Sequence, residues 1–311
     1  MRVRWHLATL VGVALLGAPA SAVTIDWVTV GNPGNAADTT GYGAVSYAYQ
    51  ISKYEVTNAQ YAEFLNAKAA SDPLSLYNTS MGLGFGGITR SGVSGSYTYS
   101  VIAGRGDKPV NYVSFYDALR FANWLHNGQG SGDTETGAYT LLGGIATPSN
   151  GTTVTRNAGA NIFLPSEDEW YKAAYYDAVS TSYFEYPAGT DTQTVCAAPG
   201  ATANTAVCEL GDLTDVGSYT GSASPNGTFD QGGNVFEWNE AIISGSNRGV
   251  RGGGAFDSPS FLAASLRLDV LPEGEVIDLG FRVASPIPEP SAALLMLGGL
   301  LVIARRRKRS P

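Results

Sequence analysis

The sequence predicts an α+β fold built as one domain of short helices, many short strands and long loops. Three segments, at 57–69, 114–125 and 166–174, repeat apolar side chains with the period of a helix. The β-rich segments around them are short. The 311 residues include 39 glycines, and 44% of all residues are apolar and 15% charged. This composition is typical of a loop-rich globular protein with a buried core.

Strand-like segments open the domain. Residues 24–30 alternate apolar and polar side chains and are rich in β-branched residues, and 47–51 form a second candidate. A third candidate, 94–101, lies inside the Gly-, Ser- and Tyr-rich region 71–108. A fourth, 152–155, lies in the glycine-rich region 127–160, where we expect it to pair.

The first helix begins after Thr57, a residue type that caps helix N-termini. Tyr61, Phe64, Leu65 and Ala69 then share one face, which predicts an amphipathic helix packed on the core.

The second and third helices each begin with a capping box. Ser114 precedes Asp117 by three residues, and Ser166 precedes Glu169 by the same distance. The second helix ends before Gly128, so His126 is predicted to cap its C-terminus. The third carries the acids 167–169, which could serve as catalytic carboxylates. Because acids in a first turn complement the helix dipole, we expect them to be structural.

The N-terminus has the pattern of a secretory signal peptide. Arg2 and Arg4 precede an apolar run at 7–16, and Ala20-Ser-Ala22 provides small residues for cleavage. Residues 1–22 are therefore predicted to be a leader that directs export.

The C-terminus, residues 286–311, has the pattern of a sorting signal. Pro288, Glu289 and Pro290 precede a 14-residue apolar run, which is short for a membrane span, and five basic residues follow at 305–309. The layout resembles the PEP-CTERM signal. That resemblance implies a transient anchor in the inner membrane of a Gram-negative bacterium, processing by an exosortase-type enzyme, and delivery to the outer surface or extracellular matrix. A plain tail anchor has the same topology but keeps the apolar helix.

The remaining chain is strongly acidic. The two ends hold seven of the 19 Lys and Arg residues and none of the 27 acids, so residues 23–290 carry a net charge of −15. This charge argues against nucleic acid and anionic membranes as partners, and it is compatible with the binding of divalent cations.

The chain has only two cysteines, Cys196 and Cys208. In an exported protein a pair at this spacing is expected to form a disulfide that closes a surface loop. A reactive dithiol is the alternative, but no Lys, Arg or His lies nearby in the sequence to lower a thiol pKa.

The motif at 230–238, Asp-Gln-Gly-Gly-Asn-Val-Phe-Glu-Trp, is the most informative stretch. Asn234 and Glu237 offer side-chain oxygens beside free turn carbonyls, a set that suits calcium. In the structural interpretation, Asn234 closes the turn while Phe236 and Trp238 fill the core.

Three motifs together resemble the formylglycine-generating, sulfatase-modifying-factor family. They are Gly233-Asn-Val-Phe-Glu-Trp238, Arg251-Gly252-Gly253-Gly254 and Gly280-Phe281-Arg282. Matches around the three helices extend the resemblance from about residue 47 to 284. The resemblance implies that residues 23–285 adopt the C-type-lectin-like fold variant of these enzymes. It also implies that Asn234 and Glu237 bind a structural calcium.

The same resemblance argues against the oxidation chemistry of formylglycine-generating enzymes. Those enzymes hold copper with two cysteines that follow the Arg-Gly-Gly motif, because copper(I) prefers thiolates. Here Asp257 occupies the first position and the second falls within 260–263, so we expect no copper. Once His6 has left with the leader, His126 is the only histidine, which rules out a two-histidine iron site.

The sequence thus predicts an exported, non-catalytic domain that binds a polysaccharide or a protein. The expected contact regions are loops 71–108 and 127–160, whose tyrosines and glycines suit adaptable contacts. The alternative is a formylglycine-generating-type oxidase or another metal-dependent enzyme of the same family.

Overall fold

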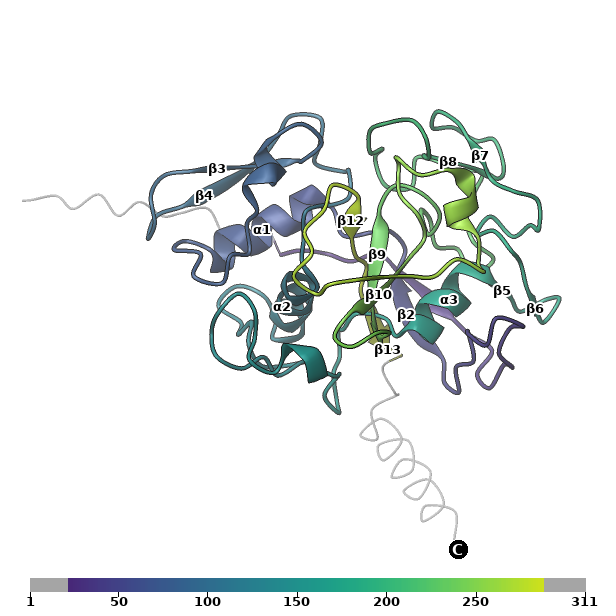
Figure 1. The fold of residues 1–311 in the computed structure, drawn as a ribbon, viewed down its shortest axis with the longest axis horizontal. Helices are drawn as coiled ribbons and strands as arrows, with labels where there is room; N and C mark the ends of the chain where they lie inside the picture. The colour runs from purple at the N-terminus through teal and green to yellow at the C-terminus, as the bar shows by residue number, and fades with distance from the viewer. Residues whose placement is uncertain (1–21, 288–311) are drawn as a thin grey trace, which may run out of the picture.

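The computed structural model describes residues 22–287 (Figure 1). Residues 1–21, which hold most of the predicted leader, and residues 288–311, which hold most of the predicted sorting signal, lie outside the described residues. The three predicted helices are present as α1 (Asn58–Lys68), α2 (Phe115–His126) and α3 (Glu167–Tyr175). Three short 3₁₀ helices accompany them at Thr79–Gly82, Gly151–Thr153 and Pro259–Leu262. Within residues 22–287, no helix combines the length and apolarity that a membrane span requires.

Two sheets organise the domain. The first has the order β1 (Trp27–Val30), β2 (Tyr49–Ser52), β13 (Ala284–Pro286), all antiparallel. It therefore joins the beginning of the domain to its end. The second has the order β11 (Leu268–Val270), β10 (Arg248–Arg251), β9 (Phe236–Ile242), β12 (Leu279–Gly280), with β12 parallel to β9. The central strand β9 begins within the motif at 230–238.

Three two-stranded pairs lie around these sheets. The hairpin of β3 (Ile88–Ser91) and β4 (Thr98–Val101) packs on α1. The strands β5 (Tyr176–Asp177) and β6 (Ser182–Tyr183) form a short antiparallel pair that follows α3. The strands β7 (Val195–Cys196) and β8 (Thr205–Ala206) are parallel and hold the disulfide segment.

The predicted caps are confirmed. Ser114 Oγ accepts from the Asp117 N–H, and the Asp117 carboxylate accepts from the Ser114 N–H, which closes the box on α2. Ser166 and Glu169 do the same on α3, and Thr57 forms a box with Gln60 on α1. The short polar signals in the sequence therefore fix where each helix begins.

The core forms where α1 and α2 meet the terminal Gly-Phe-Arg motif. The ring of Phe121 lies 5.5 Å from that of Phe64, 6.0 Å from that of Tyr61 and 5.4 Å from that of Phe281, between centroids. All four residues are fully buried. Phe281 thus belongs to the main core, which places Arg282 next to it inside the domain.

The expectation that 152–155 pairs as a strand is wrong. Residues Gly151–Thr153 form a 3₁₀ helix instead. The carbonyl oxygens of Gly151 and Val154 accept from Arg248 Nη2 at 3.1 and 2.9 Å. These carbonyls are therefore directed at a buried guanidinium and not at a neighbouring strand.

Candidate functional site

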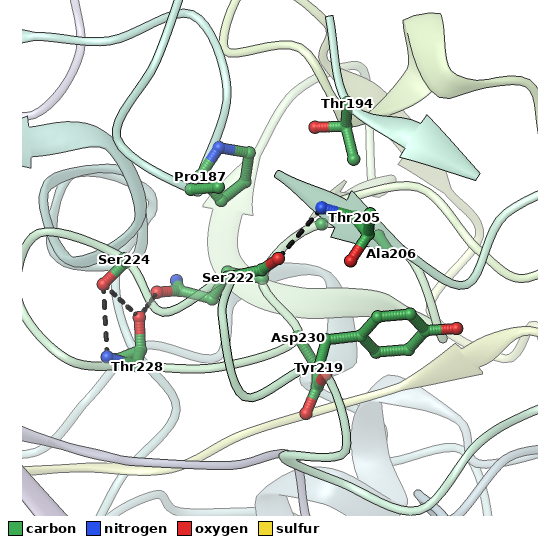
Figure 2. Close-up of a pocket in the computed structure, with 12 residues that line it drawn as sticks. Pro187, Thr194, Thr205, Ala206, Tyr219, Ser222, Ser224, Thr228 and Asp230 are labelled. Atoms are coloured by element: carbon green, nitrogen blue, oxygen red, sulfur yellow. Dashed lines mark hydrogen bonds between the residues drawn. The ribbon is translucent and has the colours of Figure 1, made fainter. Parts of the chain in front are cut away.

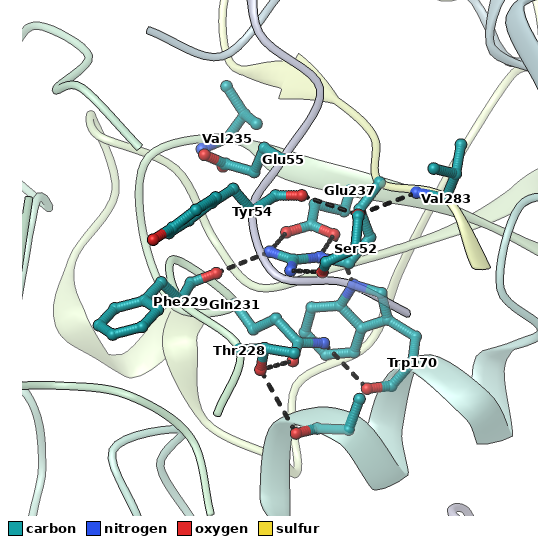
Figure 3. Close-up of polar contacts among 12 residues, drawn as sticks. Ser52, Tyr54, Glu55, Trp170, Thr228, Phe229, Gln231, Val235, Glu237 and Val283 are labelled. Carbon is teal, nitrogen blue, oxygen red and sulfur yellow. Dashed lines mark hydrogen bonds and ion pairs between the residues drawn. The ribbon is translucent and has the colours of Figure 1, made fainter. Parts of the chain in front are cut away.

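Glu237 and Arg282 form an ion pair in which both side chains are fully buried. Figure 3 shows the polar contacts around Glu237. Arg282 Nε lies 2.5 Å from Glu237 Oε2, and Arg282 Nη2 lies 2.7 Å from Oε1. Trp170 Nε1 donates to Glu237 Oε2 at 2.7 Å. Arg282 also donates to the carbonyls of Ser52 and Phe229. The pair therefore connects β9, the end of β2, α3 and the segment before the central motif.

Asn234 closes the turn that precedes β9. It has a left-handed φ of +63°, and its Oδ1 accepts from the Thr214 N–H at 3.0 Å. Its Nδ2 donates to Glu55 Oε2 at 2.8 Å, while Glu55 Oε1 accepts from the Val235 N–H. Burial raises the pKa of Glu55 well above its ordinary value.

A calcium site built from Asn234 and Glu237 does not fit this arrangement. Both oxygens of Glu237 face the Arg282 guanidinium, whose positive charge would oppose a second cation there. The Asn234 side-chain oxygen is occupied by a backbone N–H. Within residues 22–287, no three His, Cys, Asp or Glu side chains gather in a metal-holding arrangement. The structural interpretation of the motif, with a turn at Asn234 and Trp238 buried in the core, fits the geometry.

The acids of α3 are also structural. Glu167 accepts from Arg251 Nε at 2.9 Å and from Arg267 Nη2 at 2.7 Å. Glu169 accepts from Arg156 Nη2 at 2.6 Å. The third acid, Asp168, accepts from the Gly43 N–H at 2.8 Å. The sequence predicted the structural role of these acids from the helix dipole, and the structure adds these long-range contacts to it.

The Arg251–Gly254 segment packs directly against the central turn. The Gly233 N–H donates to the Gly252 carbonyl and the Ala255 N–H to the Asn234 carbonyl, both at 2.9 Å. Gly252 has φ +104°, and a Cβ there would lie 3.1 Å from the Gln231 carbonyl oxygen. The position therefore requires glycine both for its backbone and for its neighbours.

Beyond this turn, two carboxylates meet in front of Gly254. A Cβ on Gly254 would lie 3.0 Å from Asp278 Oδ2 and 3.2 Å from Asp257 Oδ2, so both oxygens border the same small space. The Gly254 N–H donates to Asp257 Oδ2 at 2.9 Å. Burial raises the pKa of Asp257, and burial followed by the charge of Asp257 raises the pKa of Asp278.

Aromatic residues lie close to this pair, and Phe256 directly precedes Asp257 in the chain. The rings of Phe85 and Phe256 lie 5.2 Å apart between centroids, in an edge-to-face arrangement. Burial, and then the charge of Asp278, raises the pKa of Tyr112. The Tyr112 N–H donates to the carbonyl of Val276, two residues before Asp278, at 3.1 Å. All of these side chains are half-buried. We define the aromatic–acidic cluster as Phe85, Tyr112, Phe256, Asp257 and Asp278.

The sequence pointed to only one member of this cluster. Asp257 was identified because it stands where the resemblance places a cysteine. Asp278 was missed, although it lies two residues before the Gly280-Phe281-Arg282 motif. No sequence motif indicated Phe85 or Tyr112, because they join the cluster only through contacts between distant segments of the chain.

The predicted disulfide between Cys196 and Cys208 is confirmed. It links β7 to the segment after β8. Both cysteines of the chain are thus joined, which leaves no free thiol.

A cavity of about 20 Å³ is lined by Thr194, which precedes β7, and by Thr205 and Ala206 of β8 (Figure 2). Hydroxyl groups line it, together with the carboxylate of Asp230, whose pKa burial raises to about 6. Ser222 Oγ accepts from the Thr205 N–H, and Ser224 Oγ lies 2.7 Å from Thr228 Oγ1. The space suits about one water molecule and is too small for a substrate.

The two loops expected to carry contacts hold four tyrosines, of which Tyr97 is half-buried beneath the Arg90 guanidinium. Tyr77, Tyr99 and Tyr139 are all buried. Their hydroxyls donate to the Ile88 carbonyl, the Ala69 carbonyl and Glu240 Oε1 respectively. These three side chains anchor the loops to the core, so they are not available to a partner.

His126 ends α2 and is bonded there. Its Nδ1 accepts from the Asn161 N–H at 3.0 Å, which ties the far end of the 127–160 loop to the helix. The contact gives His126 a structural role, but the prediction that His126 caps α2 is wrong, because its Nδ1 accepts a hydrogen bond and the C-cap residue is Asn127.

Comparison with known proteins settles the family. The model of the sulfatase-modifying factor enzyme 1-like domain family matches residues 33–287. The chain belongs to this family. Within the described residues, the fold is therefore the α+β, C-type-lectin-like arrangement of formylglycine-generating enzymes, as the resemblance implied.

Two solved structures share this fold with the family member described here. CarF is 23% identical, with a TM-score of 0.59, and the match covers 86% of this chain and 100% of CarF. The Treponema denticola variable protein 1 is 20% identical, with a TM-score of 0.51, over 86% of this chain and 98% of that protein. No curated protein matches the chain.

Proposed function

We propose that this chain is an exported, non-catalytic member of its family that binds an extracellular polysaccharide. The observation that carries the proposal is the state of the cysteines. Both are joined in a disulfide, and Asp257 stands where the first copper-binding cysteine of the family's oxidases is expected. A carboxylate and a disulfide do not provide the thiolate pair that copper(I) requires.

The aromatic–acidic cluster supports a sugar ligand. Half-buried aromatic rings present apolar faces that can cover the C–H faces of sugar rings, and carboxylates accept hydrogen bonds from hydroxyl groups. The net charge of −15 over residues 23–290 disfavours a polyanion, so the ligand is a neutral or cationic polysaccharide. A surface protein is the alternative partner. It would replace the sugar at this cluster, because three of the four tyrosines in the two loops are buried.

Export and surface delivery form part of the same proposal. The leader at 1–22 supports transport, and the Pro288-Glu289-Pro290 tail supports a transient membrane anchor and processing by an exosortase-type enzyme. Mass spectrometry of the protein recovered from the cell surface tests both ends. A mature protein that retains residues 291–304 would support the plain tail anchor instead.

Binding can be tested by affinity electrophoresis of residues 23–287 in gels that contain a neutral glucan, cationic chitosan or anionic alginate. We expect the glucan or chitosan to retard the protein. Phe256→Ala and Asp257→Asn should each weaken retardation about fivefold or more. Leu142→Ala, an exposed residue in the 127–160 loop, is the matched control and should have no effect. No retardation in any gel would overturn the polysaccharide proposal.

The enzymatic alternative is tested separately. The purified domain is loaded with copper(I) and incubated under oxygen with a cysteine-containing peptide, and aldehyde formation is followed by mass spectrometry. We expect no aldehyde, and stoichiometric aldehyde would move the oxidase to first place. Elemental analysis of the same preparation tests for calcium, for which Asn234 and Glu237 do not provide a site.

A further inference from the structure

The Gln129 side chain forms hydrogen bonds with both the N–H and the carbonyl of Val23. The Val23 N–H donates to Gln129 Oε1 at 2.7 Å, and the Val23 carbonyl accepts from Gln129 Nε2 at 2.8 Å. The side chain of Val23 is buried in the main core. Gln129 is itself fixed, because its N–H donates to the Trp124 carbonyl at 2.8 Å. A clamp of this kind fixes the position of the Val23 nitrogen.

A cavity of about 140 Å³ opens beside this clamp. Glu63 and Ala67 of α1 form one wall, and Trp124 of α2 with the Gly128–Gly130 segment forms the other. Ala22 also lines the cavity and is exposed. Glu63 is the one charged residue among these lining residues, and it is half-buried.

The electrostatic surroundings favour a positive charge at the Val23 nitrogen. The helix α2 ends at His126, just before Gln129, and the C-terminal end of a helix carries partial negative charge. Lys68, at the end of α1, directs its Nζ to the Ser131 carbonyl at 3.2 Å. His126 accepts from the Asn161 N–H through Nδ1. A cation at Val23 would therefore have an amide oxygen, a carboxylate in the same cavity and a helix C-terminus around it.

We propose that this place is the binding site for the N-terminal ammonium of the mature chain. The inference rests on the proposed export. Hydrolysis of the Ala22–Val23 bond by a signal peptidase consumes one water, leaves a carboxylate on Ala22 and leaves an amine on Val23, which takes up a proton. The departure of Ala22 opens the cavity, and the ammonium keeps Gln129 Oε1 and faces Glu63. Removal of the leader thus creates the ammonium that occupies this site.

Two proteins that end at residue 287 test the proposal, one beginning at Val23 and one at Ala22, each released from a removable fusion partner. Residues 23–287 include both sheets and the buried core, so they are the folding unit. At pH 7 the protein that begins at Val23 should unfold about 2–4 °C higher. The site raises the pKa of the bound amine above the usual value of about 7.7–8.0. We call the difference between the two unfolding midpoints the gap. It should therefore be largest below pH 7 and should close as the pH rises through the raised pKa of the Val23 amine.

Substitutions locate the effect. Gln129→Ala and Glu63→Gln, each made in both proteins, should shrink the gap, whereas the exposed Glu273→Gln should leave it unchanged. The Val23 amine should also react more slowly with an acylating reagent than the Ala22 amine. Equal midpoints and equal labelling rates from pH 6 to 9 would overturn the site. A different N-terminus on the exported protein would overturn the processing step alone.

Discussion

Glu237 and Arg282, 45 residues apart in the sequence, form a two-point ion pair in which neither side chain reaches solvent. The pair joins the central strand β9 to the last motif of the domain. Because Trp170 donates to Glu237 and three backbone carbonyls accept from Arg282, the charges are compensated inside the core. The two most recognisable family motifs are thus halves of one structural unit.

Glu237→Gln should reduce the free energy of unfolding by about 3–5 kcal/mol, because it leaves the Arg282 guanidinium buried without its counter-charge. Glutamine still accepts from Trp170, so the loss reports on charge more than on packing. Urea denaturation followed by tryptophan fluorescence measures the change.

Asp212→Asn is the matched control for this prediction. Asp212 pairs with Arg105 at 3.0 Å, but its side chain is 47% exposed. Breaking an exposed pair of this kind should cost about 1 kcal/mol or less. Equal losses for the two variants would show that burial of the Glu237–Arg282 pair has no special weight.

Gly252→Ala should destabilise the domain by about 2 kcal/mol or more. The substitution adds left-handed strain at φ +104° and pushes a methyl group against the Gln231 carbonyl and the Trp170 ring. Gly95→Ala separates the two causes, since Gly95 has φ +96° but no atom within 4 Å of the added carbon. It should cost only the strain, about 1 kcal/mol. Similar losses of unfolding free energy at both positions would show that the close contacts at Gly252 add nothing to the backbone strain.

Local signals in the sequence were sufficient for the helices, the disulfide and the family. Ser114 with Asp117 and Ser166 with Glu169 mark helix starts within four residues, and Cys196 with Cys208 left only one possible pairing. These features depend on neighbours in the chain, on counting or on contiguous motifs, which a sequence displays directly.

The chemistry of the central motif could not be read in the same way. Glu237 has oxygen atoms that suit calcium, and only the approach of Arg282 and Trp170 shows that they are occupied. Contacts between distant segments also bring Asp257 and Asp278 to the same space beside Gly254 and bury Tyr139. Sequence identifies the groups that can act, whereas the fold decides what each group faces.

Replacing both cysteines by alanine should lower the free energy of unfolding by about 3 kcal/mol. The bridge joins residues 12 apart in sequence, and the loss of this constraint increases the conformational entropy of the unfolded chain. Guanidinium denaturation of the wild type with and without reductant measures the same quantity without a mutation. If the reduced wild type is as stable as the oxidised one, the bridge is not a stabilising element of the fold.

Asp230→Asn should stabilise the domain at pH 7 and leave it unchanged at pH 4. Burial raises the pKa of Asp230 to about 6, while the unfolded chain keeps a value near 4. The folded state therefore binds the proton more tightly, and its stability falls as the pH rises between these two values. Asparagine can keep the hydrogen bond that Asp230 Oδ2 accepts from the Gly217 N–H, and it removes the charge that becomes costly.

Thermal midpoints of the wild type and the variant, measured from pH 4 to 7, check this prediction. The two curves should coincide at pH 4 and separate as the wild type loses stability. Besides burial, the groups that act on the pKa of Asp230 are the Gly217 N–H, the opposite charge of Arg282 and the like charge of Glu237, and Arg282 is already paired with Glu237. A lower midpoint for Asp230→Asn at pH 7 would contradict the prediction. It would mean that the carboxylate is ionised in the folded protein and stabilised by a cation, which the elemental analysis would then have to identify.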